Sequence, residues 1–209
     1  MKKSLLLSIV LLFLSVFFAA NEVMAFNTYE VGEITGQEYN DVWKKWFNRE
    51  FSIWVGVGKN IDNKDTEYIY FKGTTGIGDA TVRVQSSEAT IKKIKRAVEK
   101  AIEWADIARK NRADTSKGLL CFMGRSVMED ESCEGYEENK NQMGISFFAV
   151  NSGKQNSLII KLIDYDNQFI KTSLYFDLLE MKKLLKVIGE IENTFKKAHK
   201  TARDQNLFK

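Results

Sequence analysis

The densest group of ionisable side chains in the sequence surrounds Cys133. Six carboxylates lie within nine residues of one another: Glu129, Asp130, Glu131, Glu134, Glu137 and Glu138. Two carboxylates held about 5–9 Å apart can hydrolyse a glycosidic bond, and oxygen ligands can hold calcium. The segment lacks the spacing of an EF-hand, and acids in a polar loop are usually dispersed in solvent. We therefore predict no catalytic or metal site here, and a protein-binding role for four residues, Asp130, Glu131, Glu134 and Glu137.

The chain contains two cysteines, Cys121 and Cys133, with eleven residues between them. An isolated pair in an oxidising compartment usually forms a disulfide. Closing a loop of this size contributes roughly 3 kcal/mol of stability. A metal site is the alternative, but two thiolates with one distant histidine are a poor ligand set. We predict a Cys121–Cys133 disulfide.

The remaining residues offer little catalytic chemistry. His199 is the single histidine and lies among lysines near the end of a C-terminal helical segment, where we expect a solvated side chain. A Ser–His–Asp or Cys–His site would have to use it. The glycines of residues 56–60 and 73–80 lack the spacing of phosphate-binding loops, so they indicate turns. These observations favour a non-enzymatic protein without a cofactor.

Basic residues concentrate in two helical segments, over residues 92–112 and 182–203. A nucleic-acid surface would also need aromatic side chains gathered on one sheet face. Of the candidates, Tyr68 and Tyr70 share one face of their strand and Phe71 takes the other, while Trp54 lies on the preceding strand. Core packing explains most of them, and nucleic-acid binding stays an alternative.

The N-terminus predicts export. A basic start is followed by an apolar run over residues 4–20, and Val23 and Ala25 fit the pattern before a signal-peptidase cut. We predict cleavage after Ala25, with Ala20 as an alternative, and a periplasmic or extracellular location. An uncleaved anchor is less favoured because the run is short for a membrane span. No later segment predicts a span. The chain after residue 25 has a net charge of +2 and no proline.

The first element of the mature chain is predicted to be a helix. Thr35 and Glu38 have capping-box spacing. Apolar residues then follow at the spacing of one helical face: Tyr39, Val42, Trp43, Trp46 and Phe47. We expect the two tryptophans to be buried by packing, with an exposed docking face as the alternative.

Two similar series of elements follow this helix. Alternating apolar residues and turn signals predict strands, and Ser87 and Asp177 are possible N-caps of long helices. The first series comprises strands 51–59, 66–73 and 80–86 and a helix to about residue 112. The second comprises strands 118–124, 142–150, 157–165 and 168–176 and a helix ending near residue 203.

A shift of 90 residues superimposes the two series, and it aligns Ser87 with Asp177. We therefore predict a single α+β domain over residues 26–209. It would contain an N-terminal helix and two antiparallel strand-meander-plus-long-helix repeats, about 51–113 and 118–204, with helices packed on the sheets. This element order resembles that of the Whirly and PUR single-strand-binding proteins over residues 51–203. The resemblance implies a nucleic-acid-binding sheet, without a shared motif.

The sequence as a whole predicts an exported, non-enzymatic binding protein. Its partner is expected to be another protein in the same compartment, as for an immunity or inhibitor protein. Two alternatives remain open: a binder of polyanions or single-stranded nucleic acid, and a carboxylate-dependent hydrolase.

Overall fold

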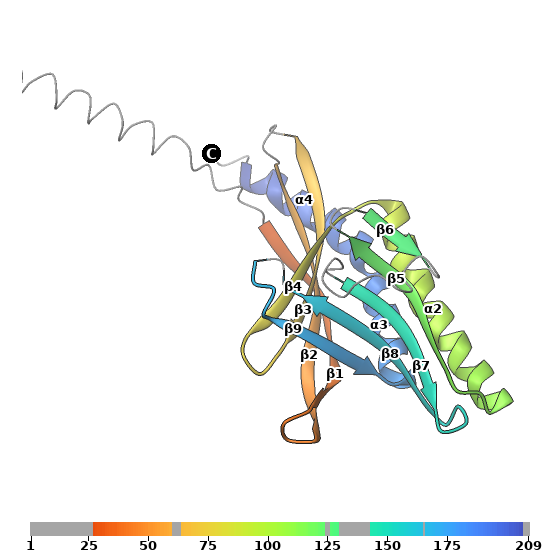
Figure 1. The fold of residues 1–209 in the computed structure, drawn as a ribbon. Coiled ribbons are helices and arrows are strands. Elements are labelled where there is room, and N and C mark those ends of the chain that lie inside the picture. The colour runs from red at the N-terminus through yellow and green to blue at the C-terminus, as the bar shows by residue number, and fades with distance from the viewer. Residues whose placement is uncertain (1–26, 60–63, 124–125, 130–142, 165, 207–209) are drawn as a thin grey trace, which may run out of the picture.

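A computed structural model describes residues 27–59, 64–123, 126–129, 143–164 and 166–206. Within these ranges the chain forms nine strands of one antiparallel sheet and three helices (Figure 1). The sheet order is β4-β3-β2-β1-β9-β8-β7-β5-β6. The strands are β1 (Asn27–Asn40), β2 (Lys45–Lys59), β3 (Asp65–Thr74), β4 (Asp79–Gln85), β5 (Thr115–Met123), β6 (Ser126–Glu129), β7 (Met143–Val150), β8 (Gln155–Ile163) and β9 (Lys171–Phe176).

The predicted N-terminal helix is wrong. Residues 35–47 instead belong to the hairpin formed by β1 and β2, which pair antiparallel from Asn27 opposite Val57 to Asn40 opposite Lys45, with a shift of register between Glu30 and Gly32. The inner face of β1 carries glycine where a strand usually shows an apolar side chain. A Cβ atom on Gly36 would lie 2.9 Å from the ring of Phe176. The ring of Phe176 fills the space that an inward side chain at Gly36 would occupy. The sequence of β1 therefore lacks the alternation of apolar and polar residues that is typical of a strand.

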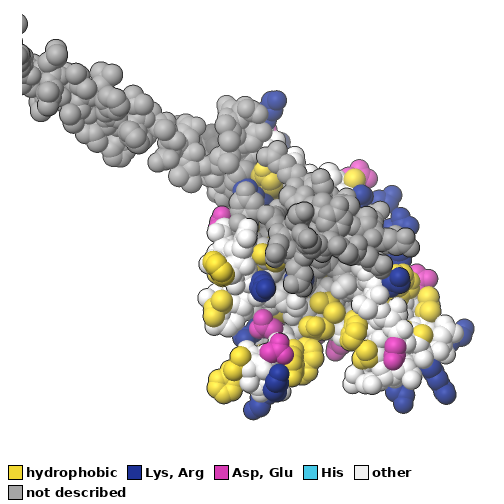
Figure 2. Space-filling model, in the orientation of Figure 1, with side chains coloured by type: hydrophobic (Ala, Val, Ile, Leu, Met, Phe, Trp, Pro, Cys, Tyr) yellow, Lys and Arg dark blue, Asp and Glu magenta, His cyan; other side chains and the backbone are white. Residues whose placement is uncertain are grey.

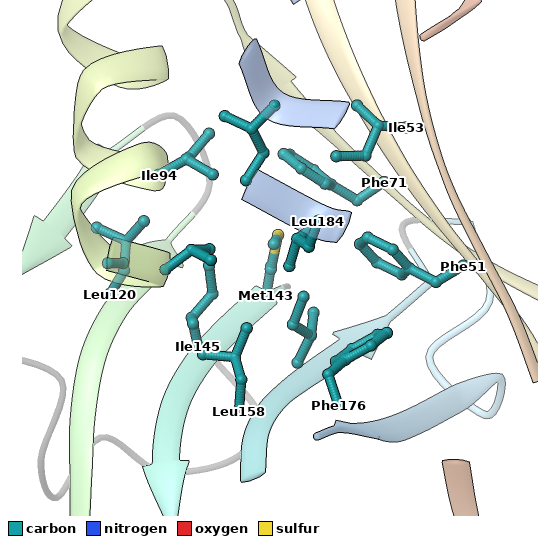
Figure 3. Packing of buried hydrophobic residues seen from close by; sticks show 14 of the residues in the cluster. Phe51, Ile53, Phe71, Ile94, Leu120, Met143, Ile145, Leu158, Phe176 and Leu184 are labelled. Carbon is teal, nitrogen blue, oxygen red and sulfur yellow. The ribbon is translucent and has the colours of Figure 1, made fainter. Parts of the chain in front are cut away.

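The sheet folds back on itself, so that its two halves share one core. β3 and β4 contact β8, although three strands, β2, β1 and β9, lie between β3 and β8 in the sheet order. Phenylalanines from both halves meet: the ring centroids of Phe51 and Phe176 are 5.5 Å apart, and those of Phe71 and Phe122 are 6.3 Å apart. Figure 3 shows Phe51, Phe71 and Phe176 on one side of Met143 and Leu184, with Leu120 and Ile145 on the other. Burial of this cluster is the main favourable contribution to folding.

The helices complete the core. They are α2 (Glu88–Asn111), α3 (Leu178–Gly189) and α4 (Ile191–Asn206). α2 contacts α3 and strands β5, β7 and β8, whereas α4 contacts β1 and β2. The predicted N-caps are confirmed: Ser87 Oγ accepts a hydrogen bond from the amide of Thr90, and Asp177 from that of Glu180. The predicted last helix is divided in two at Glu190.

The predicted fold class is therefore wrong in its overall arrangement. Two repeats, each with a separate meander and covering helix, are not shown. β1 and β9 join the first and last parts of the chain into one sheet, through the pair Gln37–Tyr175. β6 also lies in a segment for which we expected only a loop. Local patterns do not encode pairing between distant strands, so the sequence could not reveal this continuity.

Candidate functional site

The hairpin between β1 and β2 extends beyond the rest of the sheet. β2 pairs with β3 only from Phe51 onward, and β1 pairs with β9 only at Gln37. Among the described residues, those of the segment 38–50 therefore form strand pairs only within the β1–β2 hairpin: residues 38–40 pair with 45–47, and residues 48–50 pair with 35–37. In Figure 1 the turn of this two-stranded ribbon lies at the lower end of the molecule. We call residues 38–50 the projecting hairpin.

Large apolar side chains of the projecting hairpin are open to solvent. Val42 is 84% exposed and Trp43 is 69% exposed, and we call these two residues the hairpin tip. Three further aromatic residues are more than one-third exposed: Tyr39, Trp46 and Phe47. Figure 2 shows hydrophobic side chains gathered at the lower end of the molecule, where the hairpin projects. An exposed apolar cluster of this kind usually marks an interaction site.

Part of this aromatic cluster has a structural role. Tyr39 and Trp46 are directly opposite in the register, with ring centroids 5.2 Å apart. Trp46 also contacts Tyr175 of β9, at a centroid distance of 5.0 Å. Such pairs stabilise two-stranded ribbons, which are marginal in water by themselves. These ring contacts explain why Tyr39 and Trp46 are aromatic. They do not explain why the apolar side chains of the hairpin tip are exposed.

The turn holds the hairpin tip in a defined conformation. The side-chain oxygen of Asn40 accepts hydrogen bonds from the backbone amides of Val42 and Trp43, at 3.0 and 2.9 Å. Lys44 adopts a left-handed conformation with φ of 52°, and its ammonium lies 3.7 Å from the Asp41 carboxylate. Asparagine and lysine thus shape a turn whose apolar side chains face outward.

A polar cluster fixes the base of the projecting hairpin. The Glu38 carboxylate accepts a hydrogen bond of 2.8 Å from Arg49 Nε and one of 2.9 Å from the hydroxyl of Thr172. The side chains of Glu38 and Arg49 are only 17% and 22% exposed. The Arg49 guanidinium also lies 5.5 Å from the ring centroid of Phe47. These contacts tie β1 and β2 to β9, so the hairpin is anchored where it leaves the sheet.

No protein-family model, curated protein or solved structure matches the chain. Within the part of the chain that the structure describes, no helix is long and apolar enough to cross a membrane.

The predicted acidic binding residues lie outside the described residues. These are Asp130, Glu131, Glu134 and Glu137, and Cys133 lies in the same segment. Cys121 is described: it is a buried residue of β5, 2% exposed, and its backbone pairs with Gly144 of β7. The Cys121–Cys133 disulfide and the acidic binding site both stay predictions, as does the signal peptide of residues 1–25.

The aromatic residues considered for nucleic-acid binding do not form a flat platform. Phe71 is 1% exposed, within the core. The Arg83 guanidinium lies over the ring of Tyr68, 4.8 Å from its centroid. The ring of Tyr70 packs on Gly56, where a Cβ atom would approach within 2.7 Å. Tyr68 and Tyr70 are inclined at 61°, so successive bases could not stack on both in parallel.

The surroundings of Tyr70 on the outer face of the sheet also change the pKa of its side chain. Burial raises the pKa of its phenol, and the positive charge of Arg83 opposes this change. A perturbed tyrosine packed against its neighbours is consistent with a structural role.

His199 is not the fully solvated residue that we expected. Its Nε2 atom lies 2.5 Å from a carboxylate oxygen of Glu67, so it connects α4 with β3. Both side chains are about two-fifths exposed. Among the described residues no group of three or more His, Cys, Asp and Glu side chains could hold a metal ion.

Proposed function

We propose that the chain is an exported, non-enzymatic protein that binds another protein, as an inhibitor or immunity protein does. The hairpin tip would enter a concave surface of the partner. The observation that carries this proposal is the exposure of Val42 and Trp43 at the end of an anchored, projecting ribbon.

The shape of the hairpin supports insertion into a cleft. Its two strands are about 4.8 Å apart, so the ribbon is narrow enough to enter a cleft of the partner. A wider sheet could only lie over the mouth of such a cleft. Tryptophan is also the residue type that most often dominates the binding energy of an interface when a pocket encloses it.

Preorganisation is a second argument. The Asn40 side chain fixes the turn, and Glu38, Arg49 and Thr172 fix the base. A loop that is ordered before binding loses less conformational entropy when the complex forms. In this proposal the aromatic pair Tyr39–Trp46 stabilises the hairpin, and the hairpin tip contacts the partner protein.

Site-specific crosslinking tests this proposal. A photoreactive residue would replace Val42 in one variant and the exposed Leu179 of α3 in another. Both variants are produced with the native N-terminus in the source cells. We expect the probe at position 42 to yield one discrete crosslinked protein and the probe at position 179 not to do so.

Two further variants locate the contact. Trp43→Ser should abolish the crosslink at position 42, because the tip would lose its largest apolar group. Charge reversal of Glu131 and Glu134 tests the acidic segment in parallel. If reversal removes the complex and Trp43→Ser does not, the acidic segment is the binding site and the hairpin proposal is wrong.

A further inference from the structure

α3 and α4 each present a row of basic side chains to solvent. On α3, the exposed Leu179, Lys182 and Lys186 have the spacing i, i+3 and i+7, which places them on one helical face. The opposite face of α3 holds the buried residues Met181, Leu184 and Ile188.

α4 carries a second row of basic side chains. Lys196, Lys200 and Arg203 are exposed and have the spacing i, i+4 and i+7. We call these six residues of the two helices the basic helical face: Leu179, Lys182, Lys186, Lys196, Lys200 and Arg203.

Charge is distributed unequally between the helices and the rest of the chain. α2, α3 and α4 contain 14 basic and 7 acidic residues, a net charge of +7. The remaining 17 basic and 21 acidic residues give −4. The small net charge of +3 for the whole chain hides this separation. Figure 2 shows Lys and Arg side chains along the edge where α2 lies in Figure 1. A polyanionic surface would therefore attract the helical side of the molecule.

We propose that the basic helical face binds the surface of an anionic phospholipid bilayer. Lysine and arginine near such a surface are attracted by the phosphate groups, and their long stems can lie along apolar material while the charges remain in the headgroup layer. Leu179 is 62% exposed and lies one turn before Lys182 on the same face of α3. An apolar side chain within a basic helical face fits a lipid interface, whereas it adds nothing to the recognition of a phosphate backbone in water.

The position of α4 fits this attachment. His199 of α4 contacts Glu67, which lies opposite Val57 in the register of β2 and β3. Val57 is at the end of β2 remote from the hairpin tip, twelve residues from Lys45, or about 40 Å along the strand. A bilayer on the α4 part of the basic helical face would thus leave the hairpin tip free. This inference does not depend on the proposed protein partner.

Vesicle binding tests the inference directly. The chain from Phe26 onward, which includes every described residue, is mixed with vesicles of phosphatidylcholine alone or with about one-third phosphatidylglycerol, and bound protein is measured by sedimentation. We expect binding to the anionic vesicles only, and its loss in about 0.5 M salt, where the Debye length is a few ångströms. Equal binding to both vesicles, or to neither, would overturn the inference.

Charge reversal identifies the face. Lys182→Glu, Lys186→Glu and Lys200→Glu together should lower the partition coefficient on the order of 100-fold or more, because each basic residue near the surface contributes a factor of roughly five. The control reverses Lys45, Lys154 and Lys171, which are exposed and outside the helices. It makes the same change in net charge and should retain most of the binding. Equal losses in the two variants would show that only net charge matters, contrary to the inference. Circular dichroism establishes that both variants are folded.

Two additional experiments test whether the hairpin contacts the bilayer and whether the basic helical face binds nucleic acid instead. Leu179→Ser should weaken vesicle binding severalfold, whereas Trp43→Ser should not change it. If Trp43→Ser abolishes binding, the hairpin and not the basic helical face contacts the bilayer. A single-stranded oligonucleotide provides the second arm. If the protein binds it with similar salt sensitivity and ignores the vesicles, the face recognises polyanions in solution and the lipid assignment is wrong.

Discussion

The indole ring of Trp46 meets the phenol ring of Tyr175 edge to face, with centroids 5.0 Å apart and planes at 85°. This contact joins the projecting hairpin to β9, at the place where β1 and β9 share the residue pair Gln37–Tyr175. It assigns different roles to two tryptophans only three residues apart. Trp46 supports the hairpin, and Trp43 is available for contact with a partner.

Replacing Trp46 should loosen the hairpin. Trp46→Ala removes both ring contacts, so we expect a loss of about 1–3 kcal/mol in the free energy of unfolding and faster amide exchange over residues 38–50. Urea denaturation and hydrogen-exchange mass spectrometry measure these effects. Trp43→Ala is the matched control and should change stability by about 0.5 kcal/mol or less, because its side chain is 69% exposed. Equal destabilisation by the two variants would contradict the division of roles.

The Glu38 cluster should matter more than an exposed ion pair in the same hairpin. Glu38→Ala removes the acceptor of both Arg49 and Thr172 and leaves them partly buried, so we expect a cost of about 2 kcal/mol. Asp41→Ala removes the surface pair with Lys44 and should cost at most about 0.5 kcal/mol. Thermal unfolding of the two variants checks the ranking, and a larger effect for Asp41→Ala would refute it.

The turn between β7 and β8 requires glycine at position 153. Gly153 has φ of 68°, and a Cβ atom there would lie 2.2 Å from the carbonyl oxygen of Ala108 in α2. The Asp114 carboxylate also accepts hydrogen bonds from the amides of Ser152 and Gly153. Gly153→Ala should therefore destabilise the protein by more than about 2 kcal/mol, through backbone strain and displacement of α2.

Gly144 provides the control for this substitution. A Cβ atom on Gly144 would meet no atom within 4 Å, so Gly144→Ala should leave the denaturation midpoint nearly unchanged. Comparable midpoints for the two variants would show that the turn can move away from α2 without cost.

Alkaline pH should reveal the burial of Tyr70. Burial raises the pKa of this phenol above its ordinary value of 10.0, so the unfolded chain loses this proton first as the pH rises. The free energy of unfolding should fall from about pH 10 until Tyr70 also ionises in the folded protein. Tyr70→Phe removes this part of the pH dependence. Ultraviolet titration should show that the variant lacks a phenol that ionises above its ordinary pKa of 10.0; loss of a phenol that ionises at or below this pKa would disprove the assignment.

Features governed by neighbouring residues could be predicted from the sequence. Ser87 and Asp177 cap helices because each accepts a bond from an amide three residues later. Most strands that face the shared core alternate in the printed sequence, as in Met143–Val150. Such local signals are independent of the rest of the fold.

The hairpin could not be distinguished from a helix by spacing. Tyr39 and Trp46 are seven residues apart, which equals two helical turns but also places them opposite each other across this turn. The inward face of β1 could not be recognised from the sequence at Gly36, because Phe176 of β9 fills the space where a side chain would lie. The candidate site was therefore expected to be buried. The dipeptide Asn40–Asp41, a turn signal inside the presumed helix, was the available indication.

The pairing of β1 with β9 limits the order in which the sheet can form as the chain folds. β1 begins at Asn27 and β9 ends at Phe176, so the two partners in the middle of the sheet are almost the first and last strands made. A chain that emerges from its N-terminus can form the β1–β4 meander early, but it cannot join the two halves until nearly all its strands have appeared. Until then β1 has an open hydrogen-bonding edge. The window for mispairing or chaperone binding therefore lasts for most of the time that the chain takes to emerge.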